Sequence, residues 1–170
     1  MVTLERHRPG QALSSDAEHG LHWYLEGPVL EQFRIEKKQA MPEEITVLFG
    51  HTHKPFQQEM QFAGYPQRVS VYNSGGWVVD QLLPTPIYGA AAILLDEHLH
   101  TTSLRMYNQA ASPKDYAVRV EDSSPGASNP FHERIKSLVQ PERDPWRAFS
   151  DAVAEGVHIH AQVLQTKINM

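Results

Sequence analysis

The spacing of hydrophobic residues changes along the chain and predicts a mixture of helices and strands. Between residues 21 and 40 the apolar positions recur at roughly helical intervals, and Gly27-Pro28 is suited to starting the main helix. The stretch "ITVLFG" (45–50) is a continuous β-branched and apolar run, which predicts a strand buried on both faces. A helix followed by such a strand indicates α/β architecture.

The middle of the chain carries further strand patterns. "RVSVYN" (68–73) alternates between apolar and polar residues, and the "SGG" after it supplies the positive-φ positions of a turn. Residues 91–95 and 102–107 predict the two strands of a hairpin, which the polar segment "DEHLH" joins. We therefore expect a β-rich centre.

The polar, turn-rich residues 1–20 predict a loop or loose end, and residues 109–130, which are rich in proline and serine, predict a linker. Residues 21–108 would form the main body, and residues 131–170 a helical extension.

The extension holds two predicted helices. Asn129 and Asp144 are placed to cap them, with Pro130 and Pro145 in their first turns. The second helix carries one apolar stripe, which favours core or partner contacts: Trp146, Phe149, Val153, Val157 and Leu164.

Composition narrows the class of protein. A chain of 170 residues, 41% apolar and 21% charged, is typical of one soluble globular domain. Its formal net charge of -5 argues against coating nucleic acid through the overall field, but leaves room for a local anionic substrate site. No apolar run approaches the roughly 18 to 20 residues of a membrane span, and the start lacks the apolar centre of a signal peptide. We therefore expect a cytoplasmic protein without a membrane partner.

The sequence contains no cysteine, so any metal ion must be held by nitrogen and oxygen atoms. His51 and His53 follow the predicted strand 45–50, and an extended backbone would turn both imidazoles to the same side. Such a pair suits two adjacent metal ions, and Gly50 would let the chain bend and a ligand approach. The alternative is a pair of hydrogen-bonded surface histidines.

The string "FGHTHKP", followed by "VYNSGGWV", resembles the last motifs of the calcineurin-like metallophosphoesterases. In that family a G-H-x-H segment ends one strand and an N-[ST]-G-[SG] segment closes the neighbouring strand. The match covers residues 45–80 closely and extends loosely to Tyr107. The resemblance implies the C-terminal half of the family's four-layer α/β/β/α sandwich, here with a C-terminal helical extension, and thus an α/β or α+β fold.

The resemblance also implies roles for the histidines. His51 would bind one ion and His53 the other ion of a binuclear centre of two divalent metals, Mn, Fe or Zn, and a metal-bridging water or hydroxide would attack the phosphorus of a phosphomonoester or phosphodiester. Lys54 would add positive charge near the mouth, with a solvated surface lysine as the favoured alternative. The wall beside the site would be formed by Asn73, Ser74, Gly75 and Gly76.

Other parts of the family's metal site are missing. No glycine here precedes aspartate or asparagine, so the family's bridging aspartate and its Asn-His segment are absent. His19 is the candidate for a further single histidine ligand. Asp96 and His98 imitate the family's D-x-H motif, but a polar hairpin turn explains them better.

We therefore expect a metallophosphoesterase chain that is truncated and incomplete alone. Its site would be completed by a missing N-terminal half on another polypeptide or by a second copy in a homo-oligomer. The alternative is a catalytically inactive remnant that acts as an interaction or assembly module.

Overall fold

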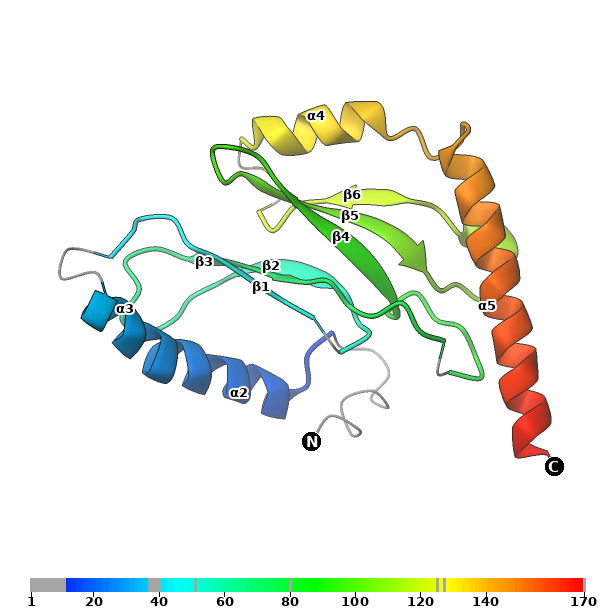
Figure 1. Cartoon of the computed structure of the whole chain (residues 1–170), viewed down its shortest axis with the longest axis horizontal. Helices are drawn as coiled ribbons and strands as arrows, with labels where there is room; N and C mark the ends of the chain where they lie inside the picture. Colours follow the sequence, from blue (N-terminus) through cyan, green and yellow to red (C-terminus); the bar gives the residue numbers. More distant parts are fainter. Residues whose placement is uncertain are drawn as a thin grey trace.

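The computed structural model describes residues 12–36, 41–50, 52–79, 81–124, 126 and 128–169. They form two small sheets with helices on the outer sides of both, so the predicted mixture of helices and strands is confirmed (Figure 1). The helices of the N-terminal part lie against one sheet. Those of the C-terminal part lie against the other, and the two sheets face each other.

Sheet A has the strand order β1-β3-β2, with β1 parallel and β2 antiparallel to β3. Its strands are β1 (Thr46–Phe49), β2 (Phe56–Met60) and β3 (Val69–Asn73). The predicted strands 45–50 and 68–73 are thus confirmed as β1 and β3, and the strand β2 is new.

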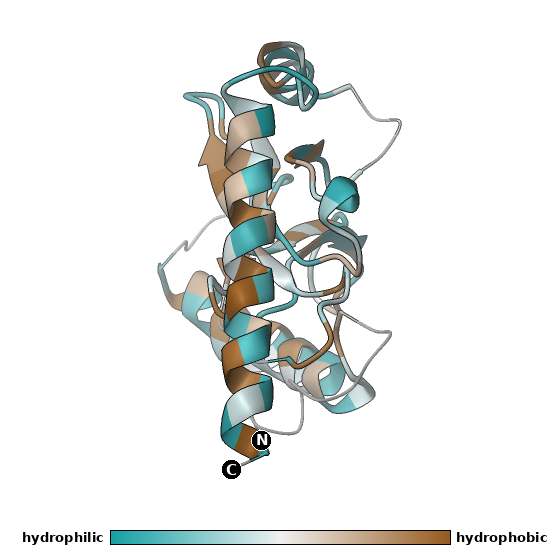
Figure 2. Cartoon of the chain, turned by 90° about the vertical axis from the view of Figure 1, so that its right-hand side faces the viewer, coloured by the Kyte–Doolittle hydropathy of each residue, from teal (hydrophilic) through white to brown (hydrophobic). Residues whose placement is uncertain are grey.

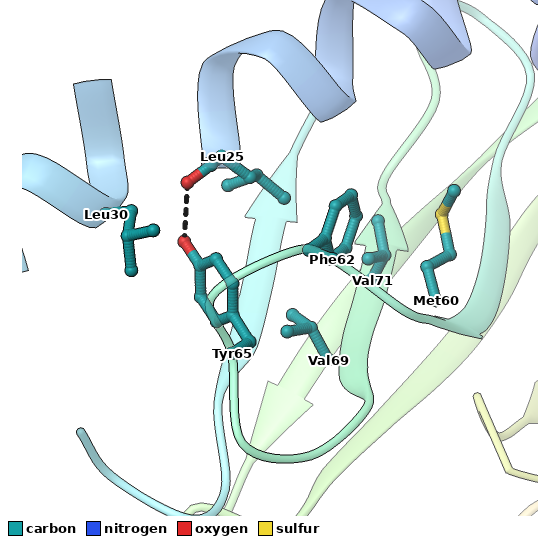
Figure 3. Close-up of a cluster of buried hydrophobic side chains, with 7 residues drawn as sticks. All are labelled: Leu25, Leu30, Met60, Phe62, Tyr65, Val69 and Val71. Carbon is teal, nitrogen blue, oxygen red and sulfur yellow. Dashed lines mark hydrogen bonds between the residues drawn. The ribbon is translucent and has the colours of Figure 1, made fainter. Parts of the chain in front are cut away.

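One face of sheet A packs on the N-terminal helices α2 (Ser15–Tyr24), η1 (Leu25–Val29) and α3 (Leu30–Glu36). In this core the hydroxyl of Tyr65 donates to the carbonyl of Leu25 over 2.9 Å (Figure 3). Burying each large apolar side chain stabilises the fold by about 1.5–3 kcal/mol. The cluster comprises Leu25, Leu30, Met60, Phe62, Tyr65, Val69 and Val71.

The helical segment starts earlier than its hydrophobic pattern predicts. The Ser14 hydroxyl accepts a hydrogen bond from the Ala17 amide at 3.2 Å, which caps α2. The predicted loop over residues 1–20 is therefore wrong from Ser15 onward, while residues 1–11 lie outside the described chain. The start predicted at Gly27-Pro28 is also wrong, because Pro28 lies inside the π-helical turn η1.

Strand β1 is not buried on both faces, contrary to the prediction. Val47 and Phe49 pack toward the helices, whereas Thr46 is exposed and Leu48 is 44% exposed. Among the described residues β1 pairs with β3 alone, so it forms the edge of sheet A. The apolar run reflects one buried face rather than two.

Sheet B contains the predicted hairpin. Strands β4 (Gly89–Leu95) and β5 (Thr101–Asn108) pair antiparallel, and β6 (Arg119–Glu121) pairs with β5. β6 falls inside the predicted linker 109–130, which is wrong for that segment. Val118, just before β6, is fully buried against the outer helices.

Two C-terminal helices, α4 (Pro130–Leu138) and α5 (Trp146–Ile168), confirm the predicted pair. The Asn129 side chain accepts from the His132 amide at 3.0 Å and caps α4, as expected. The apolar stripe of α5 packs on sheet B through Val157 and Phe149. Figure 2 shows apolar positions continuing toward the C-terminal end of α5. Among the described helices, none has the length and apolar character to cross a membrane.

The contact between the two sheets is polar. The Tyr72 hydroxyl of β3 donates to the Thr101 carbonyl and to the Asp122 carboxylate, each at 3.0 Å. The Ser123 hydroxyl donates to the Ser70 hydroxyl at 3.1 Å. A cleft of about 530 Å³ opens beside these residues. Sheet A and sheet B thus meet through hydrogen bonds rather than through a shared apolar core.

Candidate functional site

The two segments that carry the sequence motifs follow the carboxyl ends of β1 and β3, on the same side of sheet A. Phe49 of β1 pairs with Asn73 of β3 in parallel register, so both strands end side by side. The Ser74 amide donates to the Phe49 carbonyl at 2.8 Å and extends the pairing by one residue. We call residues 50 and 52–55 the β1 loop, and residues 74–79 the β3 loop. His51 lies outside the described residues, so its predicted role stays a prediction.

Asn73 joins the two loops. Its side chain is completely buried, and its amide group donates to the Thr52 hydroxyl and, at 3.0 Å, to the Lys54 carbonyl. Its side-chain oxygen accepts from the Gly75 amide at 3.0 Å. A buried carboxamide with these partners fixes the path of both loops, because any shift would leave a polar group unsatisfied.

His53 is held in an unusual conformation. Its φ is 59°, in the left-handed region that residues other than glycine seldom adopt. Its carbonyl accepts from the Gly89 amide at 3.1 Å, and its side chain is only 7% exposed. The prediction that an extended backbone presents both histidines is therefore wrong at His53. A turn fixed by β4 sets its direction instead.

Glycines let the two loops approach each other closely. A Cβ on Gly50 would lie 2.7 Å from the Ser74 hydroxyl, and one on Gly76 would overlap the His53 ring. Gly75 has the predicted positive φ, at 70°. The predicted wall of the site therefore lies against the β1 loop, with the His53 imidazole beside Gly76.

Lys54 is completely buried, so the solvated-lysine interpretation is wrong. Its ammonium lies 5.8 Å from the centroid of the Tyr88 ring, at the start of β4. Lys54 therefore belongs to the packed interior of the β1 loop rather than to its surface.

The structure does not assemble a complete metal site from the described residues. His19 lies on an exposed position of α2. Within the described part of the chain, no three or more His, Asp, Glu or Cys side chains are grouped closely enough to hold an ion. Metal centres require about three or four protein ligands. The described donor set alone therefore does not fit the expected binuclear centre.

The D-x-H imitation at Asp96 is a turn, as predicted. Its carboxylate accepts from the amides of His98 and His100 at 2.9 and 2.8 Å, and contacts the His100 imidazole at 2.9 Å. Desolvation alone would raise the pKa of this carboxyl, but the hydrogen bonds from His100 and His98 outweigh it and lower the pKa. Asp96 thus shapes the β4–β5 hairpin.

Sequence reasoning missed the aromatic side of the site. Trp77 directly follows Gly76 and stacks on Tyr107 of β5, with ring centroids 5.7 Å apart and planes inclined by 25°. The indole is still 58% exposed. The available signal was a large aromatic residue directly after a glycine turn, but its partner is remote in sequence.

Comparisons with known proteins found no relative of this chain. The chain matches no family model, no curated protein and no solved structure.

Proposed function

We propose that this chain supplies one side of a metal-dependent phosphoesterase site, within the C-terminal half of a calcineurin-like α/β/β/α sandwich. The observation that carries the proposal is the joining of the β1 loop to the β3 loop by Asn73. Both segments of the resemblance meet at the carboxyl ends of parallel strands, where ligand sites of open α/β sheets gather.

Two further observations agree with a ligand site at this place. His53 lies beside Gly76, where a Cβ on the β3 loop would overlap its ring, and Lys54 next to it is completely buried. The helix–sheet–sheet–helix order of the described chain also agrees with the proposed sandwich (Figure 1).

In this proposal the chain's own residues orient the site, and the remaining metal ligands come from elsewhere. His53 offers one imidazole, while Asn73 and Gly75 fix the loop geometry around it. The metal ions would supply the activated water and charge stabilisation of phosphoester hydrolysis. Carboxylate ligands would come from another polypeptide segment or from a second copy of the chain.

The test combines metal binding with hydrolysis. Calorimetry with Mn²⁺ or Zn²⁺ would be compared between the wild type and a double variant His51→Ala, His53→Ala, alongside hydrolysis of bis(4-nitrophenyl) phosphate. For the wild type we expect saturable metal binding with a dissociation constant at or below about micromolar, and measurable hydrolysis. In the double variant, metal affinity and hydrolysis rate should each fall at least about tenfold.

His160→Ala serves as the matched control, since His160 is an exposed histidine on α5. Its Nδ1 contacts only the Gly156 carbonyl within its own helix, at 3.1 Å. Metal binding that the double variant retains, together with no hydrolysis, would overturn the proposal for the chain as it stands.

A second candidate function, an interaction module without catalysis, is favoured by one observation. Distal positions of α5 expose large apolar side chains, namely Ile159, Val163 and Ile168. If they bind a second copy, sedimentation would show a metal-free oligomer that Val163→Asp dissociates. Gln162→Asp, the neighbouring exposed position, would leave it intact. A monomer at all concentrations would exclude self-assembly through this face.

A further inference from the structure

We propose that Trp77 is a stacking platform for a planar aromatic ring, and that the ligand it receives is an aromatic phosphoester. The ring belongs to a nucleobase or to an aryl group joined to the phosphate. This inference rests on the proposed phosphoesterase function for the phosphate part, while the platform itself rests on the geometry of Trp77.

The indole stacks on a residue of the protein and is still largely exposed. Tyr107 lies beneath it at a centroid distance of 5.7 Å, and Tyr107 itself is buried on β5. The Gln109 side chain donates to the Tyr107 hydroxyl at 3.4 Å. With 58% of its surface exposed, Trp77 presents an aromatic face that is already oriented. A ligand ring that stacks there needs little reorganisation of the protein.

The platform adjoins the candidate site through a rigid connection. The Gly76 amide, one residue before Trp77, donates to the Gly89 carbonyl at 3.0 Å. Gly89 in turn donates to the His53 carbonyl at 3.1 Å. The exposed ring therefore follows directly on the backbone that contacts the His53 imidazole. One ligand can occupy both places only if its ring and its anionic group are close together, as in a nucleotide or an aryl phosphate.

The segment that follows Trp77 carries further exposed apolar side chains. Val78, Leu82 and Leu83 are exposed in the same segment, between β3 and β4. The indole itself offers a large apolar face on which a flat aromatic ring can stack. Stacking of one base on an aromatic side chain changes affinity by about tenfold, and does so without reading the base identity.

Ligand-observed NMR titrations of the full chain test the inference with four probes. They are adenosine 5′-monophosphate, adenosine, ribose 5-phosphate and 4-nitrophenyl phosphate. We expect the two aromatic phosphates to bind about tenfold more tightly than ribose 5-phosphate. Trp77→Ala should remove this advantage, and Trp77→Phe should keep most of it. Tighter binding of one aromatic phosphate than of the other identifies the ring as nucleobase or aryl.

Trp23→Ala is the matched control, because Trp23 is also exposed but lies on α2. Its affinities should equal those of the wild type. Equal binding of ribose 5-phosphate and the aromatic phosphates, or an unchanged ratio in Trp77→Ala, overturns the inference and leaves the phosphoesterase function standing. If adenosine and adenosine 5′-monophosphate bind with equal affinity, and Trp77→Ala weakens both, the ring platform is supported but the phosphoester site is not. Absence of any aromatic binding overturns the platform.

Discussion

The side-chain amide of Asn73 donates to the backbone carbonyl of Lys54 over 3.0 Å, and thereby joins the end of β3 to the residue after His53. Asn73→Ala should lower the free energy of unfolding by about 2–4 kcal/mol, because it leaves buried partners unsatisfied. Urea unfolding measures the change. Asn169→Ala, at an exposed position after α5, should change it by less than about 0.5 kcal/mol. Equal effects of the two substitutions would show that Asn73 does not join the loops.

Substituting Gly76 should disturb His53 directly. A Cβ at this position would overlap the imidazole, with Nε2 only 2.9 Å away, so Gly76→Ala forces the ring to move. We expect a loss of about 1–3 kcal/mol of stability and shifted NMR signals of the His53 ring. Thermal unfolding and histidine spectra provide the measurements.

Gly156 offers the opposite case in the same chain. It lies within α5, and a Cβ there would meet nothing within 4 Å. Gly156→Ala should therefore stabilise the protein by about 0.5–1 kcal/mol through helix propensity. If both alanine variants changed stability alike, close approach to His53 would not be the reason for glycine at position 76.

Tyr72 should make stability depend on alkaline pH. Burial raises the pKa of its hydroxyl from 10.0 to about 12, so the folded chain holds this proton more tightly than the unfolded chain. The contribution, about 2 kcal/mol, is fully present below pH 10.0 and is lost as the pH rises toward 12. Denaturant titrations from about pH 8 to about pH 12 would measure this slope.

Tyr72→Phe should reduce that slope and, at neutral pH, cost about 1–2 kcal/mol for the lost hydrogen bonds between the sheets. Tyr24→Phe is the control, because Tyr24 is exposed on α2. A slope that is the same in Tyr72→Phe and in the wild type would assign the alkaline loss to other groups.

Asn129 both caps α4 and ties it to sheet B. Its oxygen accepts from the His132 amide, while its amide donates at 2.9 Å to the Thr101 carbonyl and to the Asp122 carboxylate. Asn129→Ala should cost about 1–2 kcal/mol from the cap alone, and more with the lost ties. Asn129→Ser restores the cap but not the ties, and should recover part of the loss. Full recovery in the serine variant would mean that the ties contribute nothing.

The strands that sequence pattern predicted are those whose apolar residues face one core. β1, β3 and the β4–β5 hairpin have this character. β2, with the sequence "FQQEM", was not predicted because it contains polar residues in place of an apolar run. Gln57 pairs with Tyr72 and Glu59 with Ser70, the two β3 residues whose hydroxyls contact sheet B. β6 escaped because it has only three residues within a serine-rich stretch. Tertiary pairing, rather than local preference, creates both strands.

The candidate site was predictable only in part, for the same reason. The glycine turn at Gly75 follows from local sequence, and its positive φ is confirmed. The burial of Lys54 depends on Tyr88, and the orientation of Trp77 depends on Tyr107, both of which are remote along the chain. No pattern within a short window contains such partners. The metal-binding roles of His51 and His53 stay predictions.

The polar contact around Tyr72 has a consequence for the way the molecule opens. The helix-covered core of sheet A and the cores of sheet B share no buried apolar residue. We therefore expect each half to unfold as its own cooperative unit, because hydrogen bonds that water can replace join the two. Amide exchange should divide the chain into two groups of protection. The boundary should lie at the β3 loop, where the Ala91 amide of β4 donates to the Ser74 carbonyl at 2.8 Å. An opening of one half would then alter the candidate site before the other half unfolds.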